Sequence, residues 1–231
     1  METLNIIYCF SFEDRADATF AVSVDPVSLT LQTAPRSILP AWIKLEHHQC
    51  PDCPMAHTGA INCPMADALI DLHEFAGHLD SFKQLAVTVT TPEREIRTVV
   101  PAQRAFSSLM GLLIATCACP DVAWLRPMAR FHLPMASEIE TIYRATSMYL
   151  LAQYFRCKAG AIPDLSLEGL RLRYVRLHEI NIAMASRLRS VIDKDASVNA
   201  VVLLDMLAKA MPYSVADSTV ELEHLFRAYL D

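Results

Sequence analysis

Glycine is scarce in this chain, with five glycines among 231 residues. Nucleotide-binding loops need closely spaced glycines, because the backbone has to approach the phosphates without side chains in the way. The sequence contains no glycine-rich phosphate loop, and no Gly-x-Ser-x-Gly turn that would carry a nucleophilic serine. The scarcity of glycine therefore argues against a nucleotide-binding fold.

Runs of basic residues and long apolar runs are also missing. No two Lys or Arg residues are adjacent and the formal net charge is −6, which argues against nucleic acid as a partner. The most apolar stretch, 109–118, is too short to span a bilayer. The first five residues lack the basic region that opens a secretory signal. We therefore expect a cytoplasmic protein that has no membrane partner.

The hydrophobic content of 53% is enough for a sizeable core. Residues 1–100 contain alternating β-branched and aromatic residues, which predicts antiparallel strands. Residues 101–231 have helical patterns, including the capping box formed by Ser137 and Glu140. The expected strands are 5–12, 19–24, 28–32, 84–90 and 95–100, and the expected helices are 65–75, 102–116, 137–156, 167–192, 197–211 (ended by Pro212) and 218–229.

These elements predict the fold class α+β. We expect an antiparallel sheet of four or five strands with a cysteine-rich loop, followed by a bundle of about five helices. No Gly/Ser linker separates the two parts, so the prediction is a single domain over 1–231.

Four cysteines are each followed by proline, namely Cys50, Cys53, Cys63 and Cys119. Thiols stay reduced in the cytoplasm, so clustered cysteines there favour metal binding over disulfides. Cys50 and Cys53 form a Cys-x-x-Cys pair, which brings two sulfur atoms within reach of one ion. The sequence therefore predicts a metal site in the loop 47–64.

This pair and Cys63 provide three ligands, and the fourth position has two candidates. Cys119 shares the Cys-Pro context and would tie the β-rich part to the helical part, whereas His48, or His47 beside it, is the local alternative. Zinc takes four ligands from Cys and His, and an iron–sulfur cluster takes four thiolates. We expect a zinc ion or an iron–sulfur cluster, in a structural role within a binding or regulatory module.

Two other functions of the same segment stay open. A redox or metal-dependent enzyme would use the cysteine site, or the pair Cys117 and Cys119, as its working part. A copper-handling protein would add the soft ligands Met55, His57 and Met65 to the thiols. The alternative for both methionines is packing in the core.

Arg126, Arg130 and His132 lie close together among apolar residues. Cationic side chains in such a setting bind an anion or a carboxylate substrate. The alternative is pairing with Glu138 and Glu140 of the next helix. The expected partner is a small ligand or another protein, and a homo-oligomer is left open.

The chain also resembles an uncharacterised bacterial protein family, a domain of unknown function. The resemblance covers nearly the whole chain, and its landmarks are the segments 48–54, 63–64, 108–113, 125–134, 141–155 and 195–212. It implies a self-contained bacterial cytoplasmic protein, and it carries over no activity, ligand or catalytic residue.

Overall fold

The computed structural model describes residues 2–12, 15–76, 79–191 and 196–230. It confirms the predicted α+β class, because an antiparallel sheet is combined with a set of helices that follows it in the chain. The sheet has four strands in the order β2-β1-β3-β4, and every neighbouring pair is antiparallel. Its strands are β1 (Leu4–Ser11), β2 (Ala18–Val24), β3 (Gln84–Thr90) and β4 (Glu95–Pro101).

Two short helices separate the two halves of the sheet in the chain, and the remaining helices follow β4. The α-helices in the described residues are α1 (Pro64–Ala68), α2 (Ile70–Ala76), α3 (Ala102–Thr116), α4 (Arg126–Arg130), α5 (Glu138–Lys158), α6 (Glu168–Arg189), α7 (Ala196–Glu223) and α8 (Arg227–Leu230). The short 3-10 helices are η1 (Ala41–Ile43), η2 (Pro54–His57), η3 (Pro120–Leu125) and η4 (His224–Phe226).

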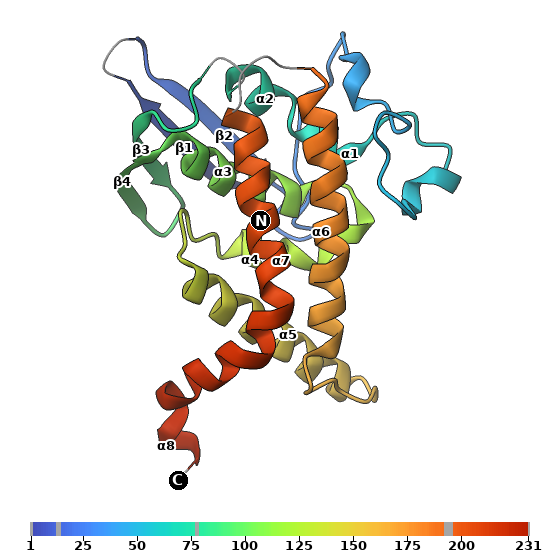
Figure 1. Cartoon of the computed structure of the whole chain (residues 1–231), viewed down its shortest axis with the longest axis vertical. Coiled ribbons are helices and arrows are strands. Elements are labelled where there is room, and N and C mark those ends of the chain that lie inside the picture. The colour runs from blue at the N-terminus through green and yellow to red at the C-terminus, as the bar shows by residue number, and fades with distance from the viewer. Residues whose placement is uncertain (1, 13–14, 77–78, 192–195, 231) are drawn as a thin grey trace.

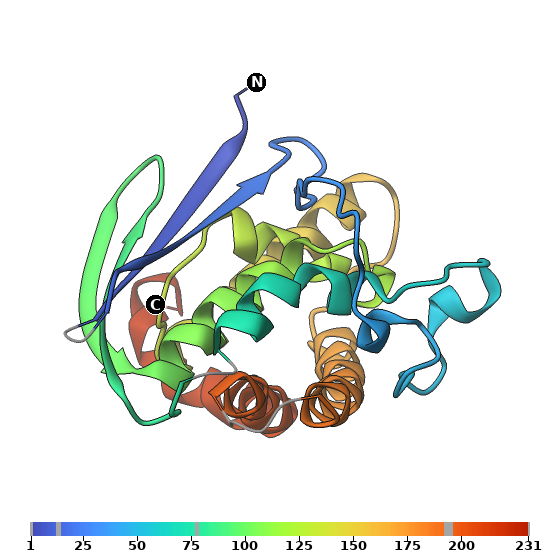
Figure 2. The same cartoon turned by 90° about the horizontal axis from the view of Figure 1, so that it is seen from above.

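Helix α3 lies at the centre of the molecule. The sheet curves around one side of it, and α7, with α6 beside it, covers another side (Figure 2). Helices α6 and α7 run next to each other along much of their length (Figure 1). Eleven residues of α3 are buried, which explains why this helix is apolar on nearly every face.

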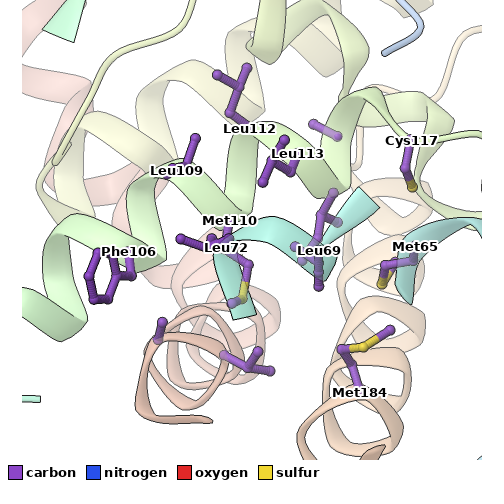
Figure 3. Close-up of a cluster of buried hydrophobic side chains, with 14 of the residues drawn as sticks. Met65, Leu69, Leu72, Phe106, Leu109, Met110, Leu112, Leu113, Cys117 and Met184 are labelled. Carbon is purple, nitrogen blue, oxygen red and sulfur yellow. The ribbon is translucent and has the colours of Figure 1, made fainter. Parts of the chain in front are cut away.

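The core joins the sheet to the helices through aromatic and aliphatic side chains. In β1 every second residue is buried, and Tyr8 and Phe10 are completely inaccessible. Phe10 packs against Phe106 of α3, with ring centroids 5.2 Å apart. Beyond this contact, side chains of α1 and α2 meet α3, and Met65 of α1 points toward Met184 of α6 (Figure 3). The buried residues form one hydrophobic cluster that includes both the sheet and the helices.

The structure departs from the expected elements at three places. The strand expected over 28–32 is reduced to one bridge between Leu31 and Val24, and the helix expected over 65–75 is divided into α1 and α2. The prediction that Pro212 ends a helix is wrong, since α7 continues from Ala196 to Glu223, and the separate helix expected over 218–229 does not form. The expected end at 192 lies outside the described residues.

In the described part of the chain, no single helix is both long and apolar enough to cross a membrane. Helix α3 and the following segment Pro120–Arg130 reach that length and composition only as a pair bent by 112°.

Candidate metal site

Three of the four Cys-Pro cysteines occupy the same structural position. Cys53, Cys63 and Cys119 each precede a short helix whose first residue is proline, and these helices are η2, α1 and η3. Proline suits the first helical position because its fixed φ matches the helix and its missing N–H is not needed there. The repeated Cys-Pro step is therefore a repeated helix start that places a thiol at the N-terminus of each helix.

The loop that carries the Cys-x-x-Cys pair is a tight turn. Asp52, between Cys50 and Cys53, has a left-handed backbone with φ of 47°, a conformation that aspartate tolerates better than most residues. Its carbonyl oxygen accepts a hydrogen bond of 3.3 Å from Nη2 of Arg176 on α6. Arg176 also forms an ion pair of 2.8 Å with Asp121 of η3. One arginine thus connects the turn to the segment that follows Cys119.

The structure places all four predicted thiols in one neighbourhood at the edge of the core. Cys63 and Cys119 are buried, and Cys50 and Cys53 are half-buried and pack against the same hydrophobic cluster. The pKa of the Cys50 thiol is raised to about 12, mainly by burial and to a smaller extent by Cys63, Cys53 and Cys119. The pKa of the Cys119 thiol is raised to about 11. Burial is the main cause, and the hydrogen bond from the backbone of Asp121 partly offsets it.

The thiols are near one another without forming a finished coordination sphere. All seven cysteines are free. Within residues 2–12, 15–76, 79–191 and 196–230, no group of three or more His, Cys, Asp or Glu side chains stands in position to hold a metal ion. His48, the alternative fourth ligand, is exposed, and its ring packs on that of His47 at 4.8 Å.

A buried arginine adjoins the thiols. Arg187 of α6 is 2% exposed, and its guanidinium donates hydrogen bonds to the carbonyl oxygens of Trp42 and Lys44, both at 2.6 Å, and of Leu45 at 3.3 Å. These bonds fasten the segment before the cysteine loop to α6. Arg187 forms no ion pair with a carboxylate in the described part of the chain.

The charge of Arg187 is influenced by the cysteines instead. Burial lowers the pKa of the guanidinium, while Cys63, Cys50 and Cys53 raise it. A buried charge normally has a partner of opposite sign. The thiols of the cysteine site are therefore the groups from which that partner would come.

Sequence reasoning missed Arg187 and Arg176, although α6 contains a signal for the first. The buried positions of α6 recur every three or four residues, and Arg187 falls on this stripe, three residues after Met184 and next to Leu188. A charged residue at an apolar position predicts a specific partner for its side chain. Arg176 has no comparable signal, because its partner Asp121 is 55 residues away in the chain.

The three residues predicted to bind an anion have different partners, although Arg130 and His132 line one small cavity beside the turn between β3 and β4. Arg130 forms an ion pair of 3.0 Å with Glu93 in the turn between β3 and β4, not with the acidic residues of α5. Nε of Arg126 is buried and finds no hydrogen-bond partner in the part of the chain that the structure describes. His132 lies 2.6 Å from the hydroxyl of Tyr8 through Nε2, and it lines a cavity in the helical part.

The soft ligands of the copper alternative have other positions. Met65 is 1% exposed and is part of the core, and Met55 packs against the same core. His57 is exposed. Cys117, the second half of the suggested redox pair, is buried, and burial raises the pKa of its thiol to about 12. These positions match core packing for the two methionines and for Cys117.

The comparisons with known proteins identify a family and nothing more. No curated protein and no solved structure matches this chain. The family model described as "Domain of unknown function (DUF6901)" matches residues 6–227. Since the match covers nearly the whole chain, this protein belongs to that family of unknown function.

Proposed function

We propose that this protein is a cytoplasmic metal-binding protein, in which Cys50, Cys53, Cys63 and Cys119 hold a zinc ion or an iron–sulfur cluster in a structural role. The bound metal would join the cysteine loop to the start of η3, and thereby hold the N-terminal part against the helices. The protein would act as a binding or regulatory module, and the metal site would connect its N-terminal part to the helices.

The observation that carries the proposal is the buried guanidinium of Arg187 beside the thiols, without a carboxylate partner in the described residues. A thiol whose pKa is raised to about 12, as burial does to Cys50, is neutral at pH 7. Without a metal, the charge of Arg187 would therefore face uncharged sulfur. Four thiolates around a divalent zinc ion have a formal charge of about −2, which would compensate a neighbouring buried cation.

The local backbone around the thiols favours their use as ligands. They belong to a proline-stiffened loop and to helix starts, and three of them lie at helix N-termini, where the backbone dipoles favour a thiolate. Metal binding displaces the thiol protons, so the raised thiol pKa values make metal affinity strongly dependent on pH.

Elemental analysis of the full chain, purified without chelators and without oxygen, tests the proposal. We expect about one zinc ion per chain in a colourless protein, or iron and sulfide in a brown one. Cys50→Ser and Cys53→Ser are expected to lose the metal and to unfold at lower temperature. Cys157→Ser is the matched control, because Cys157 is an exposed thiol on α5 away from the loop.

A protein that contains no metal, and whose melting temperature is unchanged by zinc or by a chelator, would contradict the proposal. A different result would separate the structural role from an enzymatic one. If the Cys50→Ser variant keeps its melting temperature but loses a redox response of the bound metal, the metal is a working part and not a structural one.

A further inference from the structure

A cavity of about 210 Å³ lies in the helical part, among α3, α5, α6 and α7. Most of its wall is apolar, with Leu112, Met128 and Leu177 among the lining residues. The described residues that line it include no Asp or Glu, but they include Arg104 and Arg144. None of the cysteines of the candidate metal site lines it. The cavity thus combines an apolar wall with positive charge.

Asn181 of α6 is a buried polar residue of the cavity wall. Its side chain is 1% exposed, and neither its amide nitrogen nor its carbonyl oxygen has a hydrogen-bond partner among the described residues. An unsatisfied buried amide is costly, and folded proteins nearly always pair such groups. The amide of Asn181 therefore lacks both a donor and an acceptor among the described groups.

Arg144 of α5 is one of the two arginines of the cavity wall, and hydrogen bonds hold it in place. Its Nη2 donates to the carbonyl oxygens of Met128 and Phe131, both at 2.9 Å. In the described residues its Nε and Nη1 make no hydrogen bond and no ion pair, so the remaining N–H groups are available. The phenol of Tyr174, 3% exposed, lies on the same wall and close enough to interact electrostatically with Arg144.

We propose that this cavity binds a small, largely apolar carboxylic acid, whose carboxylate pairs with Arg144 and whose second polar group hydrogen-bonds to Asn181. A dry cavity of about 150 Å³ accepts benzene, so this cavity of about 210 Å³ has room for a somewhat larger molecule. Tyr174 and Asn181 are seven residues apart on α6, which is about 10 Å along the helix. This separation favours a linear acid with a hydroxyl or carbonyl group at its far end.

Binding to the full chain is measured by calorimetry with four probes of similar size: octanoate, ω-hydroxyoctanoate, octan-1-ol and octylamine. We expect both acids to bind, the hydroxy acid more tightly, and the neutral and cationic probes to bind about tenfold more weakly or not at all. Arg144→Met should weaken both acids by about tenfold or more. Arg156→Met is the matched control, since Arg156 is an exposed arginine of the same helix that does not line the cavity.

The Asn181→Leu variant tests whether the amide of Asn181 contacts the ligand or is only an unsatisfied group in the fold. This variant removes an unsatisfied buried amide, so the free protein should be more stable, while the hydroxy acid should lose its advantage over octanoate. Ala115→Leu, which fills part of the cavity, should abolish binding of both acids without lowering the melting temperature.

Any one of three results would overturn the proposal. Octan-1-ol could bind as tightly as octanoate, both acids could fail to bind at about 1 mM, or the Ala115→Leu variant could bind the acids as well as the wild type. The outcome does not depend on the metal, because the cysteine variants leave this wall intact.

Discussion

The hydroxyl of Tyr8 in the sheet lies 2.6 Å from Nε2 of His132, which is 124 residues further along the chain. The same hydroxyl is 2.8 Å from Oγ of Ser108 on α3, and that oxygen accepts a hydrogen bond of 2.9 Å from the backbone N–H of Met135. Burial raises the pKa of Tyr8 well above its usual value. A neutral phenol thus connects the sheet, the central helix and the segment before α5.

Replacing Tyr8 by phenylalanine should lower the free energy of unfolding by about 1 to 3 kcal/mol. The ring would still fill its place in the core, but Ser108 and His132 would lose a partner inside the protein. Urea denaturation of the two proteins measures the difference. Tyr143→Phe is the control, because Tyr143 is exposed, and its change should stay within about 0.5 kcal/mol. Equal stability of wild type and Tyr8→Phe would show that this network contributes nothing.

Acid should begin to lower the stability of the fold at pH values above those at which carboxylates titrate. Burial lowers the pKa of His132 to about 3, with Arg144 adding to the effect, and burial lowers the pKa of His73 to about 4. In the unfolded chain both titrate near pH 6.5, so between these values the unfolded state binds protons that the folded state does not. Their stabilisation is complete above about pH 7.5, and it is lost as the pH falls below 6.5.

At pH 5 each histidine should cost roughly 2 kcal/mol of stability relative to neutral pH. Urea denaturation between pH 7.5 and pH 5 provides the measurement. His73→Asn, which keeps a polar atom near Ser197, should make this dependence shallower. A curve that is flat down to pH 5 would mean that both imidazoles become protonated without unfolding.

Arg187→Met should lower the free energy of unfolding by about 3 to 5 kcal/mol, because three buried carbonyl oxygens lose their donors. Arg187→Lys should recover only part of this loss, since an ammonium group lacks the planar fork that reaches all three oxygens. Thermal denaturation of both variants is compared with that of Arg189→Met, an exposed arginine two residues further along α6. Similar losses for Arg187→Met and Arg189→Met would refute the role given to the buried guanidinium.

Two glycines should respond to alanine in opposite directions. Gly111 is inside α3, and an added Cβ would meet only Cδ2 of Leu204 at 3.5 Å, an ordinary contact. Gly111→Ala should therefore stabilise the protein by about 0.5 to 1 kcal/mol. A Cβ on Gly169 would collide with the hydroxyl of Tyr149, which itself donates to Asp164.

Gly169→Ala should consequently destabilise by about 1 to 3 kcal/mol, because Tyr149 must move and its hydrogen bond to Asp164 is strained or lost. Differential scanning calorimetry of the two variants gives both signs in one experiment. A stabilised Gly169→Ala protein would mean that Tyr149 has free space into which to turn.

The sequence predicted those elements whose local pattern agrees with their packing. The alternating strands, the helix after Pro101 and the capping box at Ser137 all form, and Ser137 and Glu140 exchange the expected hydrogen bonds. The strand expected over 28–32 fails for a local reason that sequence patterns did not reveal. Asp25 accepts three hydrogen bonds from Val27 and Ser28, and this turn replaces strand pairing.

Pro212 shows the opposite case, in which tertiary packing overrides a local rule. A proline inside a helix costs about 3 kcal/mol, but α7 packs along both α3 and α6 and gains more from remaining helical. The helix bends in its C-terminal half as it leaves that contact (Figure 1). The cavity could not be predicted from the sequence either, because Arg144 and Asn181 come from helices whose relative placement no local pattern encodes.

The central position of α3 has a consequence for synthesis of the chain. Its apolar faces are covered by the sheet and by α7, and α7 begins about eighty residues after α3 ends, so the ribosome makes the covering helix well after α3. Until then the apolar surface of α3 stays exposed to water in the nascent chain. Fragments that stop before α7 should precipitate or recruit chaperones, and the slowest step of folding should await the C-terminal third.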